Sequence, residues 1–121
     1  MRLVIIFCFT LLFSNMSAQL QSTFVYEITL YEKFKHPTSW GEREHQIQKQ
    51  HLRYLEELTQ SGKLKIAGII NQGLEDQIGF IILNASTFEE AKKVAMNDPS
   101  VKNGMMSVRL LPLNVYFEGK Y

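Results

Sequence analysis

Apolar residues recur along this chain at a spacing that changes from segment to segment, and the order of these changes restricts the fold. In Thr23–Tyr31 apolar and polar side chains alternate, which predicts a β-strand whose core side carries Phe24, Tyr26, Ile28 and Leu30. In Glu42–Ser61 the apolar residues follow helical spacing, and Gly62 comes next, a residue typical of the position after a helix. Glu32–Gly41, between these segments, contains Pro, Ser and Gly and is predicted to be a loop.

Two short apolar runs follow the predicted helix. Leu64–Ile70 and Ile78–Leu83 are predicted strands, and the polar segment Asn71–Gln77, which contains a glycine, is predicted to join them as a hairpin.

The last third of the chain is predicted to form a helix and a final strand. Ser86 and Thr87 each precede a glutamate by three residues, which is the pattern of a capping box, and a helix is expected from there to about Asn97. Its inward residues are expected to be Phe88, Ala91, Val94 and Ala95. Met106–Phe117 is the predicted last strand, and Pro112 within it indicates a bulge or an edge position.

The order β-α-β-β-α-β is that of the ferredoxin-like fold, an α+β arrangement of a four-stranded antiparallel sheet with two helices on one side. Two helices cover only one side of such a sheet, yet Ile78–Leu83 and Met106–Phe117 are apolar on both sides. The simplest partner for the second apolar side is the same side of another copy. We therefore predict a homodimer in which two sheets enclose a barrel-like core.

Residues 1–18 have the layout of a secretory signal peptide. Arg2 precedes the apolar run 3–13, and small and polar residues follow up to Ala18. The run is well short of the roughly 20 residues that a membrane-spanning helix requires. We therefore expect export to the periplasm or the exterior, cleavage after Ala18, and a mature domain of residues 19–121 that is free of the membrane.

Charge and cysteine content exclude several classes of partner. Lys and Arg total 13 against 12 Asp and Glu, so the loss of Arg2 with the signal peptide leaves a formally neutral domain. Binding to nucleic acid depends on clustered positive charge, which the charge balance of this domain does not predict, and we expect no nucleic-acid partner. Cys8, the only cysteine, lies in the predicted signal peptide, so neither a disulfide nor a cysteine metal site is expected in the domain.

Two of the three histidines are not expected to belong to a functional site. His36 precedes a proline in the predicted loop and is expected to face solvent. His45 and His51 project to opposite sides of the predicted helix, which makes them a poor pair of metal ligands. We expect neither a metal nor a cofactor.

His51 lies within the apolar side of that helix, among Ile47, Tyr54 and Leu55, and two interpretations stay open. It is either a core histidine bonded to a backbone carbonyl or an acid/base residue in a pocket between helix and sheet, since imidazole titrates near neutral pH. Asp98 is its best candidate partner. An Asp before a Pro is also a ready N-cap for a short helix, and both roles are compatible because a capping carboxylate keeps an oxygen free.

Four segments in order resemble the YCII family, also known as the YCII-related domain. They are QHLRYLEEL (50–58), GKLKIAG (62–68), STFEEA (86–91) and DPSVKNG (98–104). The resemblance covers nearly the whole predicted domain and implies a ferredoxin-like dimeric α/β barrel. It also implies that His51 and Asp98 meet in a pocket as the catalytic pair, and at least one relative is a lyase that removes chloride from a ring compound.

Three positions depart from the family pattern. Gln48 stands where an arginine is frequent, Ile69 follows Gly68 where a proline is frequent, and Ser100 stands where an aromatic residue is frequent. The missing arginine removes an anchor for an anionic substrate. The missing aromatic residue is expected to change the pocket wall.

Three hypotheses of different classes follow. The first is an exported lyase or isomerase of a small cyclic or carbonyl compound, in which His51 is the general base or acid and Asp98 orients it and stabilises its charged form. The second is a non-catalytic dimeric module that binds a small apolar ligand in the same pocket, which Gln48 and Ser100 favour. The third is purely structural, with a core histidine and a capping aspartate.

Overall fold

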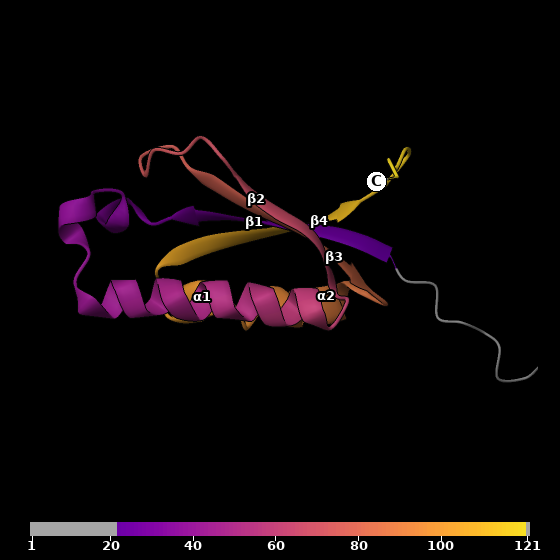
Figure 1. Ribbon diagram of the computed structural model, residues 1–121, viewed down its shortest axis with the longest axis horizontal. Coiled ribbons are helices and arrows are strands. Elements are labelled where there is room, and N and C mark those ends of the chain that lie inside the picture. Colours follow the sequence, from indigo (N-terminus) through magenta and orange to yellow (C-terminus); the bar gives the residue numbers. More distant parts are fainter. Residues whose placement is uncertain (1–21, 121) are drawn as a thin grey trace, which may run out of the picture.

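Four antiparallel strands form a single sheet in the order β2-β3-β1-β4 (Figure 1). The structure is a computed structural model and describes residues 22–120. Its strands are β1 (Ser22–Leu30), β2 (Leu64–Ile70), β3 (Ile78–Ala85) and β4 (Met106–Leu113). This strand order confirms the predicted α+β, ferredoxin-like sheet, and β4, which contains Pro112, is an edge strand as predicted.

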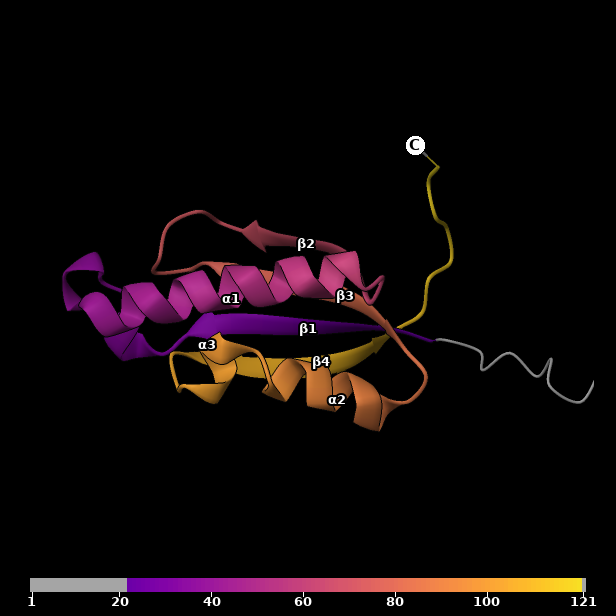
Figure 2. The same ribbon diagram turned by 60° about the horizontal axis from the view of Figure 1, so that its bottom comes forward.

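The helices lie together on one side of this sheet. They are α1 (Glu42–Gln60), α2 (Phe88–Met96) and the short α3 (Pro99–Lys102). Figure 2 shows α1 towards the β2 edge of the sheet and α2 and α3 towards β4. The predicted loop after β1 contains two single-turn 3-10 helices, η2 (Glu32–Phe34) and η3 (Pro37–Ser39). The predicted signal peptide lies outside the described residues, and within 22–120 no helix is long and apolar enough to cross a membrane.

Local sequence signals set the helix ends. Thr87 accepts a hydrogen bond from the backbone N–H of Glu90 at 3.1 Å, and the Glu90 carboxylate accepts one from the backbone N–H of Ser86 at 2.9 Å, so the predicted capping pattern starts α2. At the end of α1, Gly62 has a φ of +79°, a backbone conformation that residues with a side chain rarely adopt. The N–H of Lys63 then returns to the carbonyl of Leu58 at 3.0 Å and closes the helix.

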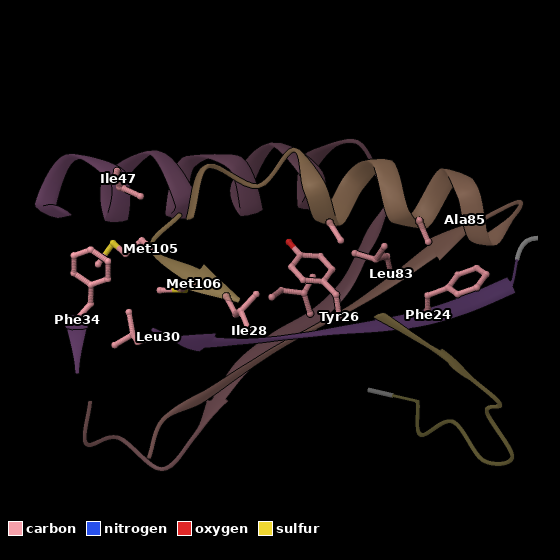
Figure 3. Packing of buried hydrophobic residues seen from close by; sticks show 13 residues of the cluster. Phe24, Tyr26, Ile28, Leu30, Phe34, Ile47, Leu83, Ala85, Met105 and Met106 are labelled. Atoms are coloured by element: carbon pink, nitrogen blue, oxygen red, sulfur yellow. The ribbon is translucent and has the colours of Figure 1, made fainter. Parts of the chain in front are cut away.

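The core lies between the sheet and the helices, and its strand residues come from alternate positions (Figure 3). The predicted inward residues of β1 are all buried: Phe24, Tyr26, Ile28 and Leu30. Gly79 of β3 is required here, because a Cβ at this position would lie 2.7 Å from Cγ1 of Ile28.

Two predicted details are wrong. β4 ends at Leu113 rather than Phe117, because among the described residues its pairing with β1 ends at the pair of Leu113 and Thr23. Phe88 does not point into the core but is 43% exposed. It occupies the first position of α2, where its ring makes an edge-to-face contact with Phe24, with 6.1 Å between the ring centres.

The side of the sheet opposite the helices carries a continuous apolar row. Ile66 pairs with Ile82, Ile82 with Val25 and Val25 with Leu111, so the row crosses all four strands. Ile66 is 50% exposed in the single chain. This row matches the two-sided apolar pattern seen in the sequence, and the homodimer remains a prediction.

Candidate active site

His51 and Asp98 are in direct contact. Helix α1 places His51 on its buried side, and the Nδ1 atom of the ring lies 2.8 Å from Oδ1 and 2.9 Å from Oδ2 of Asp98. The Asp98 side chain is completely buried. The structure therefore brings together the two residues that the sequence singled out from segments 47 positions apart.

The end of α2 and the start of α3 hold Asp98 in place. Pro99 begins α3, and Asp98 is its N-cap, whose Oδ1 accepts a hydrogen bond from the backbone N–H of Ser100 at 2.9 Å. The capping role and the contact with His51 coexist, as the sequence allowed. The short helix thus fixes the carboxylate that faces the histidine ring.

Two further side chains bind the same carboxylate. Ser100 donates its hydroxyl to Oδ1 at 2.8 Å, and Tyr26 donates its hydroxyl to Oδ2 at 3.0 Å. In Figure 3 the Tyr26 hydroxyl points from β1 towards the helices. Asp98 therefore accepts hydrogen bonds from three side chains and one backbone group.

Sequence reasoning missed both of these roles. Tyr26 was assigned to the core, and Ser100 was expected to change the pocket wall, but Ser100 does not line the cavity described below and serves Asp98 instead. Each had a readable signal. A tyrosine on a buried strand face needs a partner for its hydroxyl, and a serine two residues after a capping aspartate lies next to the carboxylate.

Burial and hydrogen bonds act in opposite directions on Asp98. Burial alone would raise the pKa of this carboxyl, but the hydrogen bond and charge of His51, together with the two hydrogen bonds from Ser100, outweigh it and hold the pKa below its usual value. Burial and the neighbouring Asp98 charge raise the pKa of Tyr26, so its hydroxyl stays a donor. At neutral pH the arrangement is an ionised carboxylate surrounded by donors.

The charge state of Asp98 determines which ring nitrogen of His51 is free. An ionised carboxylate only accepts hydrogen bonds, so Nδ1 carries the hydrogen that it shares with Asp98. In neutral imidazole the other nitrogen, Nε2, then has the free lone pair. Within residues 22–120 no side chain or backbone group is hydrogen-bonded to Nε2.

A cavity of about 220 Å³ opens beside His51, between α1 and the edge of the sheet formed by β2 and β3. Its walls are mostly apolar and include Leu55, Ala67, Ile69, Phe80 and Met106. The polar side chains that line the cavity are His51, Gln48 and Gln77. None of the described lining residues is Lys, Arg, Asp or Glu. Asp98 does not line it, so the histidine ring separates the carboxylate from the cavity.

The other histidines lie apart from this cavity. His36 is exposed, as predicted, and His45 is exposed as well. In the part of the chain that the structure describes, no three His, Cys, Asp or Glu side chains gather in a group that could hold a metal ion.

Comparison with known proteins agrees with this fold. The sequence profile of the YCII-related domain matches residues 24–114. Among solved structures, the chain resembles the 5-chloro-2-hydroxyhydroquinone dehydrochlorinase TftG from Burkholderia phenoliruptrix, in complex with 2,5-dihydroxybenzoquinone. The TM-score is 0.58 at 18% identity over 76% of this chain and 93% of that one.

A second solved structure, an uncharacterised protein from Thermotoga maritima, gives a TM-score of 0.49 at 11% identity over 78% of this chain and 100% of that one. No curated protein sequence matches the chain.

Proposed function

The chain belongs to the YCII-related domain family, and on that premise we propose that it is a lyase or isomerase that acts on a small ring or carbonyl compound by proton transfer at His51. One observation carries this proposal. His51 lies between a buried carboxylate on one side and a cavity on the other. This is the arrangement that a general base needs, because one ring nitrogen is held while the other faces a ligand.

The proposed reaction starts with a proton of the bound compound. Nε2 of His51 takes this proton, and the electron pair stays on the compound. In a lyase, this electron pair expels a leaving group from the compound. In an isomerase, His51 returns the proton to another atom of the compound. Asp98 stabilises the imidazolium that forms, because a buried carboxylate at 2.8 Å attracts a positive ring strongly.

The structural neighbour supports this class of reaction. TftG is named as a dehydrochlorinase of a chlorinated hydroxyhydroquinone. Loss of hydrogen chloride requires a base for the proton, and the pair of His51 and Asp98 supplies one beside a cavity of suitable size for a single ring.

Export and dimerisation complete the proposal. Residues 1–18 would direct the chain out of the cytoplasm. The apolar row Ile66–Ile82–Val25–Leu111 would pack against the same row of a second copy and bury the side of the sheet that the helices leave open.

A non-catalytic module that binds a small ligand is the alternative. The mostly apolar walls of the cavity favour it, because they would hold a ligand without any chemistry. An enzyme would convert the single-ring compounds that it binds, whereas the binding module would release them unchanged.

Turnover assays on a panel of hydroxylated single-ring compounds test the proposal, with 5-chloro-2-hydroxyhydroquinone and its chloride release as the first probe. We expect His51→Gln to lose at least about 100-fold in turnover, because glutamine cannot accept the proton. His45→Gln is the matched control, since this exposed histidine lies on the same helix, and it should retain wild-type turnover. A His51→Gln variant as fast as the wild type would refute the mechanism.

A further inference from the structure

Gln48 has an unusual environment. Its Oε1 atom is buried, and it is the one buried side-chain nitrogen or oxygen within residues 22–120 that has no hydrogen-bond partner among the groups of the protein. An unpaired buried amide oxygen destabilises the folded chain, and native proteins rarely keep one. Because Gln48 lines the cavity, this oxygen is available to a donor group on a molecule bound there.

The position of Gln48 connects it to the proposed reaction centre. Gln48 lines the same cavity as His51, one helical turn earlier on the same side of α1. Side chains at this spacing are neighbours, with Cβ atoms roughly 5–6 Å apart. The terminal torsion of a glutamine is broad, so the carboxamide can turn its oxygen towards a group in the cavity at little cost. A single ring can therefore contact Gln48 and His51 together.

The cavity also restricts the charge and size of its ligand. No described lining residue is Lys or Arg, so an anionic ligand would lose its hydration without gaining a lysine or arginine as a partner. A cavity of about 150 Å³ holds benzene. The space of about 220 Å³ here therefore suits one ring with a few small substituents.

We propose that Gln48 selects the ligand, and that its Oε1 accepts a hydrogen bond from a hydroxyl group on an uncharged single-ring compound. This inference rests on the proposed function only in taking the cavity beside His51 as the substrate site. The ring lies against the apolar wall and presents a reacting atom to Nε2. An analogue without the hydroxyl leaves the buried oxygen unpaired and binds more weakly.

Phenol and toluene test this inference, because they have nearly the same shape and differ in the hydroxyl. The quantity to measure is the ratio of the toluene Kd to the phenol Kd, obtained by NMR titration of the folded protein. We expect Gln48→Met to lower this ratio about tenfold, since one hydrogen bond to a buried group has about that effect. Gln50→Met, an exposed position on the same helix, should leave the ratio unchanged.

Three results would overturn the inference. They are an unchanged ratio in Gln48→Met, an equal fall in Gln50→Met, and tighter binding of benzoate than of phenol by the wild type. The benzoate comparison needs no variant and holds even if Gln48→Met fails to fold. Binding preference and turnover are separate measurements, so this inference and the mechanism at His51 can each fail without the other.

Discussion

The Nδ1–H of His51 is shared between both carboxylate oxygens of Asp98, at 2.8 and 2.9 Å. This contact joins the middle of α1 to the junction of α2 and α3, and it is closed off from solvent because both side chains are buried. The carboxylate is in turn fixed by Ser100 and Tyr26. The pair is therefore rigid on one side and open to a cavity on the other, and the predictions below follow from this asymmetry.

Removal of the carboxylate should destabilise the chain far more than the loss of a helix cap. Asp98→Ala leaves the Tyr26 hydroxyl, the Ser100 hydroxyl and the His51 N–H buried without an acceptor, and we expect a cost of about 3 kcal/mol or more in the free energy of unfolding. Thr87→Ala removes the cap of α2 alone and should cost about 1 kcal/mol. Urea unfolding measures both. Equal costs for the two variants would favour the purely structural reading of Asp98.

The pKa of Asp98 predicts how stability depends on pH. Because this pKa is lower in the folded chain than in the unfolded chain, the ionised carboxylate adds stability above the unfolded pKa of about 4, and that stability is lost as the pH falls towards the folded pKa. The difference in the free energy of unfolding between the wild type and Asp98→Asn should therefore shrink as the pH falls below about 4. Urea unfolding at successive pH values measures this difference. A difference that grows as the pH falls below about 4 would contradict the direction of the Asp98 pKa shift.

Tyr26 should contribute to the proposed reaction only through Asp98. Tyr26→Phe keeps the ring in the core and removes one hydrogen bond to a charged group, so we expect a loss of about 1.5 kcal/mol in stability. Turnover should fall as well, though less than in His51→Gln, because the carboxylate keeps its other donors. Tyr54→Phe is a matched control, since Tyr54 donates to the carbonyl of Val94 and not to Asp98. A control that lowered turnover as much as Tyr26→Phe would remove Tyr26 from the mechanism.

Gln48 should lower the free energy of unfolding of the ligand-free protein. Gln48→Met replaces an unpaired buried amide with an apolar side chain of similar length, so the free energy of unfolding should rise by about 1 kcal/mol. Gln50→Met, in solvent on the same helix, should change it little. Thermal unfolding without a ligand measures both. A loss of stability in Gln48→Met would indicate that the amide has a partner in the folded protein.

The predicted homodimer depends on the apolar row across the sheet. Ile66→Lys places a charge at a position that is half exposed in the single chain, so the chain should fold and remain monomeric. Met96→Lys changes an apolar residue of similar exposure on α2 and should leave the dimer intact. Light scattering after size-exclusion chromatography measures the mass of each. A monomeric wild type would refute the dimer.

Local patterns in the sequence were enough for the element order and for the pair at the site. Helical spacing placed His51 on the buried side of α1, and the Asp-Pro dipeptide marked Asp98 as a cap. The contact between Tyr26 and Asp98 joins residues 72 positions apart, which no local spacing encodes, so this role of Tyr26 was missed. The end of β4 was also misplaced, because strand length depends on pairing with the neighbouring strand, and in residues 22–120 the pairing with β1 ends at Leu113.

Chemical rescue tests most directly whether His51 carries the proton. His51→Ala removes the ring beside the cavity and leaves room for free imidazole. We predict that this variant loses turnover and partly recovers it when imidazole is added, in proportion to the neutral fraction of the imidazole. Wild-type turnover by His51→Ala without imidazole would contradict the proposed mechanism.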